Sequence, residues 1–223
     1  MELLAQFTGE VLVCGLLNSL LYQPPDKAHI ASLYAEGVFA ESPLGNDRDE
    51  VQQGLSLLRA WGSSAWEQDP DQAFDDLAAD YFYLFNGPGK VQAPPWESVF
   101  FSKERLIFQE QTLQVRAWYQ KFGLQIENLH HEPDDHIGLQ LGFLAHLAQM
   151  TVQALEQGKN AEAEWLIKEQ SAFLSQHLLR WASMWCDLVE KHARSDFYRG
   201  VSLLVRGALQ EAAELVKRTE AIR

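Results

Sequence analysis

The chain has 223 residues, 47% of them apolar, which is enough to bury the core of one large or two small domains. Its 31 acidic and 18 basic residues give a net charge of −13, which disfavours nucleic acid and anionic membranes as partners and favours a basic one. No uninterrupted run of about 18 apolar residues occurs, and the first residues lack the basic flank and small-residue cleavage site of an export signal. We therefore expect a cytoplasmic protein with no stable membrane insertion.

The first half of the chain has helical periodicity. Apolar residues recur at helical spacing from Leu4 to Leu20, and the proline pair at 24–25 ends this first predicted helix. Further helices are predicted over 26–37 after an Asp26 cap, over 47–61, and from Pro70 to the residue before Gly87. Cys14 and Cys186 stand alone within such apolar patterns, so buried free thiols are expected.

Two irregular segments interrupt the second half. The stretch 87–99, GPGKVQAPPWESV, holds three prolines and two glycines, so it predicts a rigid loop. Ser102 is predicted to cap a helix over 103–122 that ends at Gly123. A second irregular segment, 124–133, precedes a long helix from Asp134 to the residue before Gly158. Helices over 160–177 after an Asn160 cap, over 178–193, and from Ser195 onward complete the chain.

Strand alternation and internal repeats are both lacking. The sequence therefore predicts an all-α fold, a compact bundle of roughly eight to ten helices. We expect a single domain over 1–223, with the connector 124–133 between two helical halves. Asp134 and Asp135, placed in a first helical turn, would complement the helix dipole.

The stretch HHEPDDHIG, residues 130–138, raises the question of a metal. His131 and His136 are five residues apart, about 140° beyond one helical turn, and Pro133 lies between them, so no metal is expected. His130 is interpreted, like His131, as a solvated bystander. Phosphate-loop and G-x-S-x-G patterns are lacking, so an enzyme is not expected. An acidic helical hydrolase stays open as an alternative, with Glu132, Asp135 and His136 as acid, base and orienter.

Two long segments carry a resemblance to a known family. DYFYLFNGPGKVQAPPWESVFF, residues 80–101, resembles an aromatic-rich pattern of the TorD/DmsD family of chaperones for molybdenum-containing redox enzymes. EPDDHIGLQLGFLAHL, residues 132–147, resembles that family's E-P-x-D-H-I/F-G pattern, and FYR at 197–199 extends the likeness, which is closest to the DmsD branch.

The resemblance implies a cytosolic, cofactor-free, all-α chaperone. Such a protein binds the twin-arginine signal peptide of a molybdopterin oxidoreductase of the dimethyl sulfoxide or trimethylamine N-oxide reductase kind. It prevents premature export until the client has folded and received its cofactor. The implied partners are that signal peptide, the precursor enzyme and components of the Tat translocase. An assembly chaperone of the nitrate-reductase branch, which needs no export proofreading, is the alternative within the family. A structural adaptor that docks a helix on the 84–96 surface is another.

The resemblance also implies which residues form the peptide site. A twin-arginine signal joins two guanidinium groups to an apolar segment, so its receptor needs a hydrophobic groove bordered by acceptors. The wall of the groove is assigned to Leu84, Phe85, Pro95 and Trp96. The acceptor loop is assigned to Glu132, Pro133, Asp135 and His136, with Asp135 as the preferred partner of arginine. A position in the core is the competing interpretation for Leu84, Phe85 and Trp96.

One position departs from the pattern. Many DmsD-like members carry tryptophan directly after the G-P of the first motif, where this chain has Gly89, which leaves the identity of the client open. Some family members form domain-swapped oligomers, so both a monomer and a swapped homo-oligomer are expected forms, with 124–133 as the hinge. Guanine-nucleotide binding, suggested for the family, has no phosphate loop in this sequence to support it.

Overall fold

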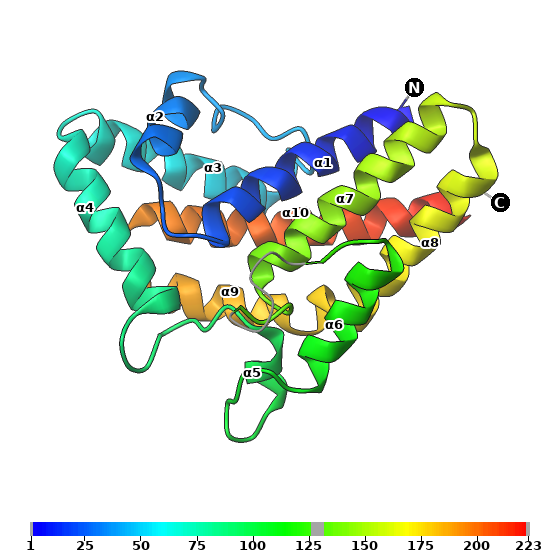
Figure 1. The fold of residues 1–223 in the computed structure, drawn as a ribbon. Helices are drawn as coiled ribbons and strands as arrows, with labels where there is room; N and C mark the ends of the chain where they lie inside the picture. Colours follow the sequence, from blue (N-terminus) through cyan, green and yellow to red (C-terminus); the bar gives the residue numbers. More distant parts are fainter. Residues whose placement is uncertain (1, 126–131, 222–223) are drawn as a thin grey trace.

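The computed structural model describes residues 2–125 and 132–221, and within these ranges the chain is helical without β-strands (Figure 1). The all-α bundle of eight to ten helices is confirmed. The α-helices are α1 (Glu2–Leu21), α2 (Lys27–Ala35), α3 (Asp49–Trp61), α4 (Pro70–Tyr81), α5 (Glu97–Phe101), α6 (Glu110–Lys121), α7 (Ile137–Glu156), α8 (Asn160–Gln176), α9 (Leu178–His192) and α10 (Asp196–Ala221). Turns of π-helix, Gly62–Trp66 and Phe82–Asn86, continue α3 and α4.

Several helix ends follow from local chemistry, as predicted. The Asp26 side chain accepts a hydrogen bond from the His29 amide at 2.8 Å, which satisfies a free donor at the start of α2. Pro70 is the first residue of α4, where its missing N–H costs nothing. Gly123 and Gly158 adopt left-handed φ values of 72° and 69° just beyond α6 and α7, a conformation that glycine adopts without strain.

Two predicted boundaries between residues 97 and 122 are wrong. The loop predicted over 87–99 ends early, because Glu97 begins the short helix α5. The helix predicted over 103–122 begins at Glu110 instead. Arg105 and Phe108 have left-handed φ values of 54° and 57°, which interrupt a helix. Ser102 caps a turn and not a long helix, because its hydroxyl accepts a hydrogen bond from the Leu106 amide at 3.2 Å.

Two predicted caps also need correction. At the start of α8, Asn160 is the first helical residue. The capping position is held by Lys159, which makes no side-chain capping bond. Asp134 and Asp135 lie ahead of α7 and not in its first turn, so they do not complement its dipole. Its cap is His136.

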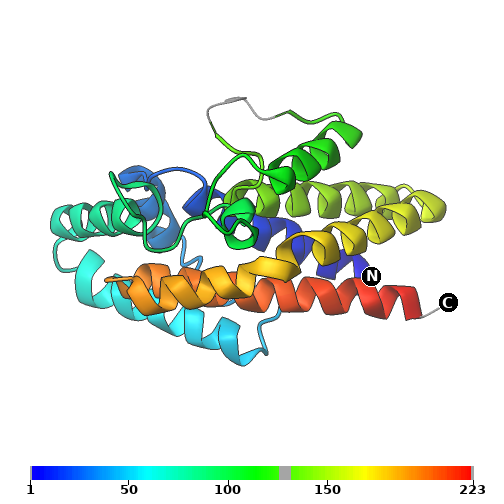
Figure 2. The same ribbon diagram turned by 90° about the horizontal axis from the view of Figure 1, so that it is seen from below.

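The bundle is organised around its longest helix. α10 runs the length of the molecule between α1 and α9 in Figure 1, and it contacts α3, α9, α1 and α8. α1 packs along α7, and Figure 2 shows α3 and α6 on opposite faces of the bundle. By length and hydropathy α1 is the single described helix that could cross a membrane. Phe7, Cys14 and Leu17 of α1 are buried in the bundle, so core packing accounts for its apolar composition.

α3 and α10 approach closely where two glycines face each other. A methyl group built on Gly54 would lie 2.8 Å from the Gly200 carbonyl oxygen, and one built on Gly200 would lie 2.8 Å from the Gly54 carbonyl oxygen. Both contacts are with backbone, which cannot move aside cheaply. The close crossing of α3 and α10 therefore requires glycine, which has no side chain, at both positions.

We predict that Gly54→Ala lowers the free energy of unfolding by about 2 kcal/mol, because the new methyl group overpacks the α3–α10 crossing. Gly15→Ala is the matched control. It also lies within a helix, but no atom lies within 4 Å of its added methyl group, so the better helix propensity of alanine raises stability by up to about 1 kcal/mol. Urea unfolding of both variants measures the effect. Equal shifts for the two would contradict the close approach.

Candidate functional site

The two segments that carry the sequence motifs lie side by side. The Ile137 amide donates a hydrogen bond to the Pro95 carbonyl at 2.7 Å, and the Glu97 amide donates to the Asp135 carbonyl at 3.1 Å. These bonds form an isolated antiparallel bridge between Trp96 and His136. The bridge gives hydrogen-bond partners to backbone amide and carbonyl groups that have none within their own proline-containing segments. It brings residues 40 positions apart in sequence into one candidate site.

Asp135 is fully buried, and both of its carboxylate oxygens accept hydrogen bonds. Oδ2 accepts from the Ser98 amide at 2.7 Å, and Oδ1 accepts from the Thr112 hydroxyl at 2.7 Å. Ser98 lies in α5 and Thr112 lies in the first turn of α6. The carboxylate therefore fastens the starts of two helices to the loop before α7. In this conformation neither oxygen is open to a ligand.

Asp134 is also engaged inside the protein. Its Oδ2 accepts hydrogen bonds from Arg116 Nε at 3.1 Å and Nη2 at 2.7 Å, while its carbonyl accepts from the Tyr119 hydroxyl at 3.0 Å. Burial, and then the nearby carboxylates, raise the pKa of Tyr119 well above its usual value, so the phenol stays a donor. Both aspartates of the motif thus anchor α6.

Trp96 and Glu132 form the accessible part of the site. The Trp96 indole N–H donates a hydrogen bond to Glu132 Oε1 at 2.7 Å, and both side chains are half-buried. Partial burial raises the pKa of Glu132, and the Trp96 bond opposes that shift. Among the described residues, no hydrogen bond reaches the other oxygen, Oε2. Oε2 can therefore accept from a ligand without breaking a hydrogen bond to the residues that the structure describes.

The remaining predicted site residues are buried. Leu84 and Phe85 lie in the core, where the Phe85 ring stacks on Trp185 at 5.7 Å and meets Tyr198 edge-on at 5.4 Å. Peptide contact stays a prediction for all eight residues. In the described conformation, six of them support the surface from behind: Leu84, Phe85, Pro95, Pro133, Asp135 and His136.

His136 caps α7 through its ring. Nδ1 accepts a hydrogen bond from the Gly138 amide at 3.0 Å, and the ring meets Tyr22 and Trp96 edge-on at 5.6 Å and 6.1 Å. Burial lowers the pKa of His136 to about 3, so the ring is neutral and can accept. The glycine that follows is required by packing, because a methyl group on Gly138 would lie 2.9 Å from Tyr22.

Sequence reasoning missed a buried polar network behind this bridge. Glu97 Oε2 accepts a hydrogen bond from Gln140 Nε2 at 3.0 Å and lies 3.0 Å from His177 Nδ1. Gln140 Nε2 also donates to the Asp135 carbonyl at 3.0 Å. The side chains of these residues, Glu97, Gln140, His177 and Asp135, are all almost fully buried. The one sequence signal was Glu97 itself, a charged residue directly after the PPW of an otherwise apolar motif.

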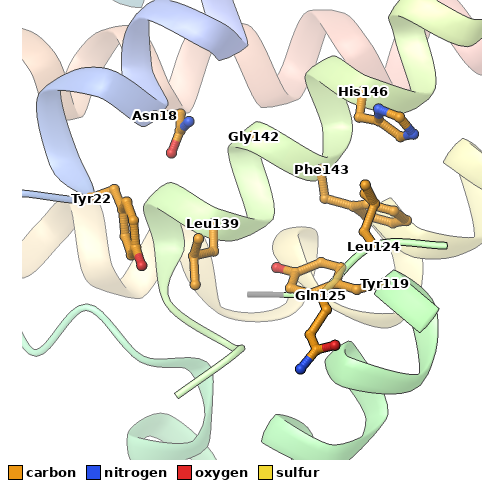
Figure 3. Close-up of a pocket in the computed structure, with 9 residues that line it drawn as sticks. All are labelled: Asn18, Tyr22, Tyr119, Leu124, Gln125, Leu139, Gly142, Phe143 and His146. Carbon is orange, nitrogen blue, oxygen red and sulfur yellow. The ribbon is translucent and has the colours of Figure 1, made fainter. Parts of the chain in front are cut away.

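A cavity of about 350 Å³ adjoins the site between α1, α6 and α7 (Figure 3). Its lining is mostly apolar, with the polar groups of Asn18, Tyr22 and His146 around it. Asn18 Oδ1 is buried and receives no hydrogen bond from the described residues. Burial lowers the pKa of His146. Tyr22 connects this cavity to the motif loop, because its ring also contacts His136.

A metal centre has no support in the part of the chain that the structure describes. Within residues 2–125 and 132–221, no group of three or more His, Cys, Asp or Glu side chains is arranged to hold an ion. His130 and His131, the predicted bystanders, lie outside the described residues.

We predict that Asp135→Ala lowers the free energy of unfolding by about 3 kcal/mol, because it leaves the buried Ser98 amide and Thr112 hydroxyl without acceptors. Glu132→Ala is the control. It removes a carboxylate of the same loop that is half-exposed, so it costs at most about 1 kcal/mol. Chemical denaturation of the two variants measures both values. A melting temperature for Asp135→Ala equal to that of the parent would show that the carboxylate is not an anchor.

We predict that His136 makes the fold sensitive to acid. Its pKa is about 3 in the folded chain and about 6.5 when unfolded, so its contribution is complete above pH 6.5 and is lost as the pH falls toward 3. Between pH 7 and pH 5 this loss is about 2 kcal/mol of unfolding free energy. In His136→Asn the asparagine side chain can still accept the capping hydrogen bond, but it has no group that takes up a proton in this pH range. The stability of this variant should therefore fall less than that of the parent between pH 7 and pH 5. Parallel pH profiles for parent and variant would argue against this assignment.

The chain is similar in sequence to known proteins. A family model described as nitrate reductase delta subunit matches residues 45–187. The chain is 35% identical to the Tat proofreading chaperone DmsD of Salmonella typhi, over 90% of this chain and 88% of that protein. It is 31% identical to the chaperone protein TorD of Vibrio cholerae, over 87% and 86% of the two chains.

Another relative, the probable Tat proofreading chaperone DmsD of Haemophilus influenzae, is 32% identical, and that alignment covers 61% of this chain and 60% of the relative. The matched range of the family model includes the bridged segments around Trp96 and His136. The chain therefore belongs to the TorD/DmsD family, whose family model carries the description nitrate reductase delta subunit.

Proposed function

We propose that this protein is a redox-enzyme maturation chaperone that binds the twin-arginine signal peptide of a molybdopterin oxidoreductase. Relatives named Tat proofreading chaperone and chaperone protein TorD, aligned over most of the chain, support this function. The structural observation that carries it is the half-buried pair of Trp96 and Glu132, where the two motif segments meet.

The chemistry of this pair suits an arginine side chain. A guanidinium group donates in a planar fork, and Glu132 Oε2 can accept from it while Oε1 stays bonded to Trp96. The indole ring next to the carboxylate provides a face on which a guanidinium can stack. Lysine keeps the charge but lacks the planar fork, so it loses the second bond and the stacking. This site therefore predicts a preference for arginine that charge alone does not give.

The proposed mechanism is mass action. A signal peptide held on the chaperone is not free to engage the export machinery, so export waits while the client folds and receives its cofactor. The net charge of −13 attracts a cationic signal from a distance and speeds the encounter. We propose a cytoplasmic location and no catalytic step. The precursor enzyme and components of the Tat translocase are the proposed partners.

A second candidate function stays within the family. The matching family model is described as nitrate reductase delta subunit, which favours an assembly chaperone that binds a client segment during cofactor insertion without export proofreading. Both functions place a client peptide on the same surface. They differ in whether the recognised segment carries a twin-arginine motif.

The hydrolase alternative gains no support from the geometry. Both oxygens of Asp135 are occupied by internal hydrogen bonds, and Nδ1 of His136 is occupied by the cap of α7. Neither group is placed to transfer a proton to a substrate beside Glu132. The adaptor alternative predicts binding that does not depend on arginine.

We predict that calorimetric titration finds binding of a twin-arginine signal peptide, and that its twin-lysine version binds at least tenfold more weakly. Glu132→Gln should reduce affinity for the arginine peptide by about tenfold and reduce the preference over lysine, because the charge-assisted bond is lost. Glu156→Gln, at the exposed end of α7, changes net charge equally and serves as the control. Equal affinity for both peptides would favour the adaptor, and binding of neither would favour the nitrate-reductase branch.

A further inference from the structure

The segment between α5 and α6 carries apolar side chains on the outside of the molecule. Figure 1 shows it as a loop that projects from the bundle below α6 and α9. Leu106, Ile107 and Phe108 are 46%, 41% and 43% exposed, and Leu113, in the first turn of α6, is 62% exposed. We call residues 102–109 the projecting loop. Four of the large apolar side chains that this structure leaves in water thus lie within eight consecutive positions.

Leaving these side chains in water costs stabilisation, and no contact in the described part of the chain covers them. Three neighbouring apolar side chains in water forgo the stabilisation that burial would give. Arg105 and Phe108 have left-handed backbone conformations. Residues other than glycine adopt this conformation at a cost in energy, so it persists only where the surrounding structure holds it. At the end of α5, the Phe101 ring is covered by the Arg180 guanidinium at 4.6 Å. The loop therefore starts from a fixed base and presents its apolar residues outward.

The base of the projecting loop belongs to the candidate site. Asp135 accepts hydrogen bonds from Ser98 before the loop and from Thr112 after it. Trp96 immediately precedes α5 and holds Glu132. The apolar surface and the proposed guanidinium acceptor are thus joined through one short helix and one buried carboxylate. Only the five-residue helix α5 separates Trp96, the partner of Glu132, from the start of the loop.

We propose that the projecting loop, together with Leu113, binds the apolar stretch that follows the two arginines in a twin-arginine signal peptide. This inference rests on the proposed function and assigns a second part of the peptide to a second element of the protein. The chemistry selects this occupant, because the surface combines an acceptor for a cation with adjoining apolar area. The loop itself adds no net attraction for a cation, because exposed Lys103 and Arg105 offset Glu104 and Glu110. The cation is attracted by Glu132 and by the net charge of −13. A second copy of this chain, with its own charge of −13, would be repelled.

The test uses the full chain with the exposed residues Leu106 and Phe108 changed together to serine. The matched control is Leu12→Ser with Met184→Ser, at two exposed apolar positions on α1 and α9. Each protein is titrated with a twin-arginine signal peptide and with a version whose apolar stretch is replaced by serines while both arginines are kept. Circular dichroism melting checks that all three proteins fold.

We expect the parent and the control pair to bind the apolar peptide at least tenfold more tightly than the serine version. The loop variant should lose most of this preference and keep its preference for arginine over lysine. A loop variant that melts like the parent and retains the apolar preference would overturn the inference alone. A parent with no preference for arginine would overturn the proposed function, and this inference with it.

A second measurement does not depend on the variant folding. A photo-crosslinking group placed in the apolar stretch of the peptide is activated on the unmodified protein, and the crosslinked residues are identified by mass spectrometry. Crosslinks to residues 101–113 are expected. Crosslinks that fall only elsewhere, for example around the cavity of Asn18 and His146, would overturn the inference.

Discussion

The buried carboxylate of Asp135 is the contact on which the centre of the molecule depends. A buried charge is tolerated only when its lone pairs are satisfied, and here an amide of α5 and a hydroxyl of α6 satisfy them. The backbone of the same residue bonds to Glu97 and Gln140, which extend the network to His177 at the start of α9. Polar contacts thereby connect α5, α6, α7 and α9 to the loop before α7. Hydrogen bonds fix the relative orientation of these elements, which non-directional apolar packing does not.

The sequence predicts several helix ends from local chemical signals, although the caps expected at Ser102 and Asn160 are wrong. Proline at 70, an aspartate cap at 26 and a glycine at 123 act within a few residues, so composition alone locates these boundaries. The projecting loop could not be predicted, because Lys103 to Gln109 has no glycine or proline to announce the left-handed turns at Arg105 and Phe108. Residue preference does not account for those conformations, and the Arg105 and Leu106 amides bond back to Ser102 at the start of the loop.

The candidate site shows the same division between local and distant causes. The structure brings the two motif segments together, but a motif does not reveal which of its carboxylate oxygens faces inward. Asp135 and Glu132 are three residues apart and both carry a carboxyl group, yet Asp135 is enclosed by α5 and α6 while Glu132 stays half-exposed beside Trp96. A motif residue such as Asp135 can therefore act from inside the protein, by holding in place the side chains that we propose a client touches.

The position of α10 also has a consequence for how the protein itself is made. α10 is the last described helix to leave the ribosome, and it occupies the middle of the bundle against α1, α3, α8 and α9. Until it emerges, the parts of those helices that pack on α10 stay uncovered, although α1, α8 and α9 can already pack on other helices. Such exposed apolar surface favours aggregation during synthesis. A protein that we propose shields a client's apolar segment thus has, during its own synthesis, apolar surface that its last helix has yet to cover.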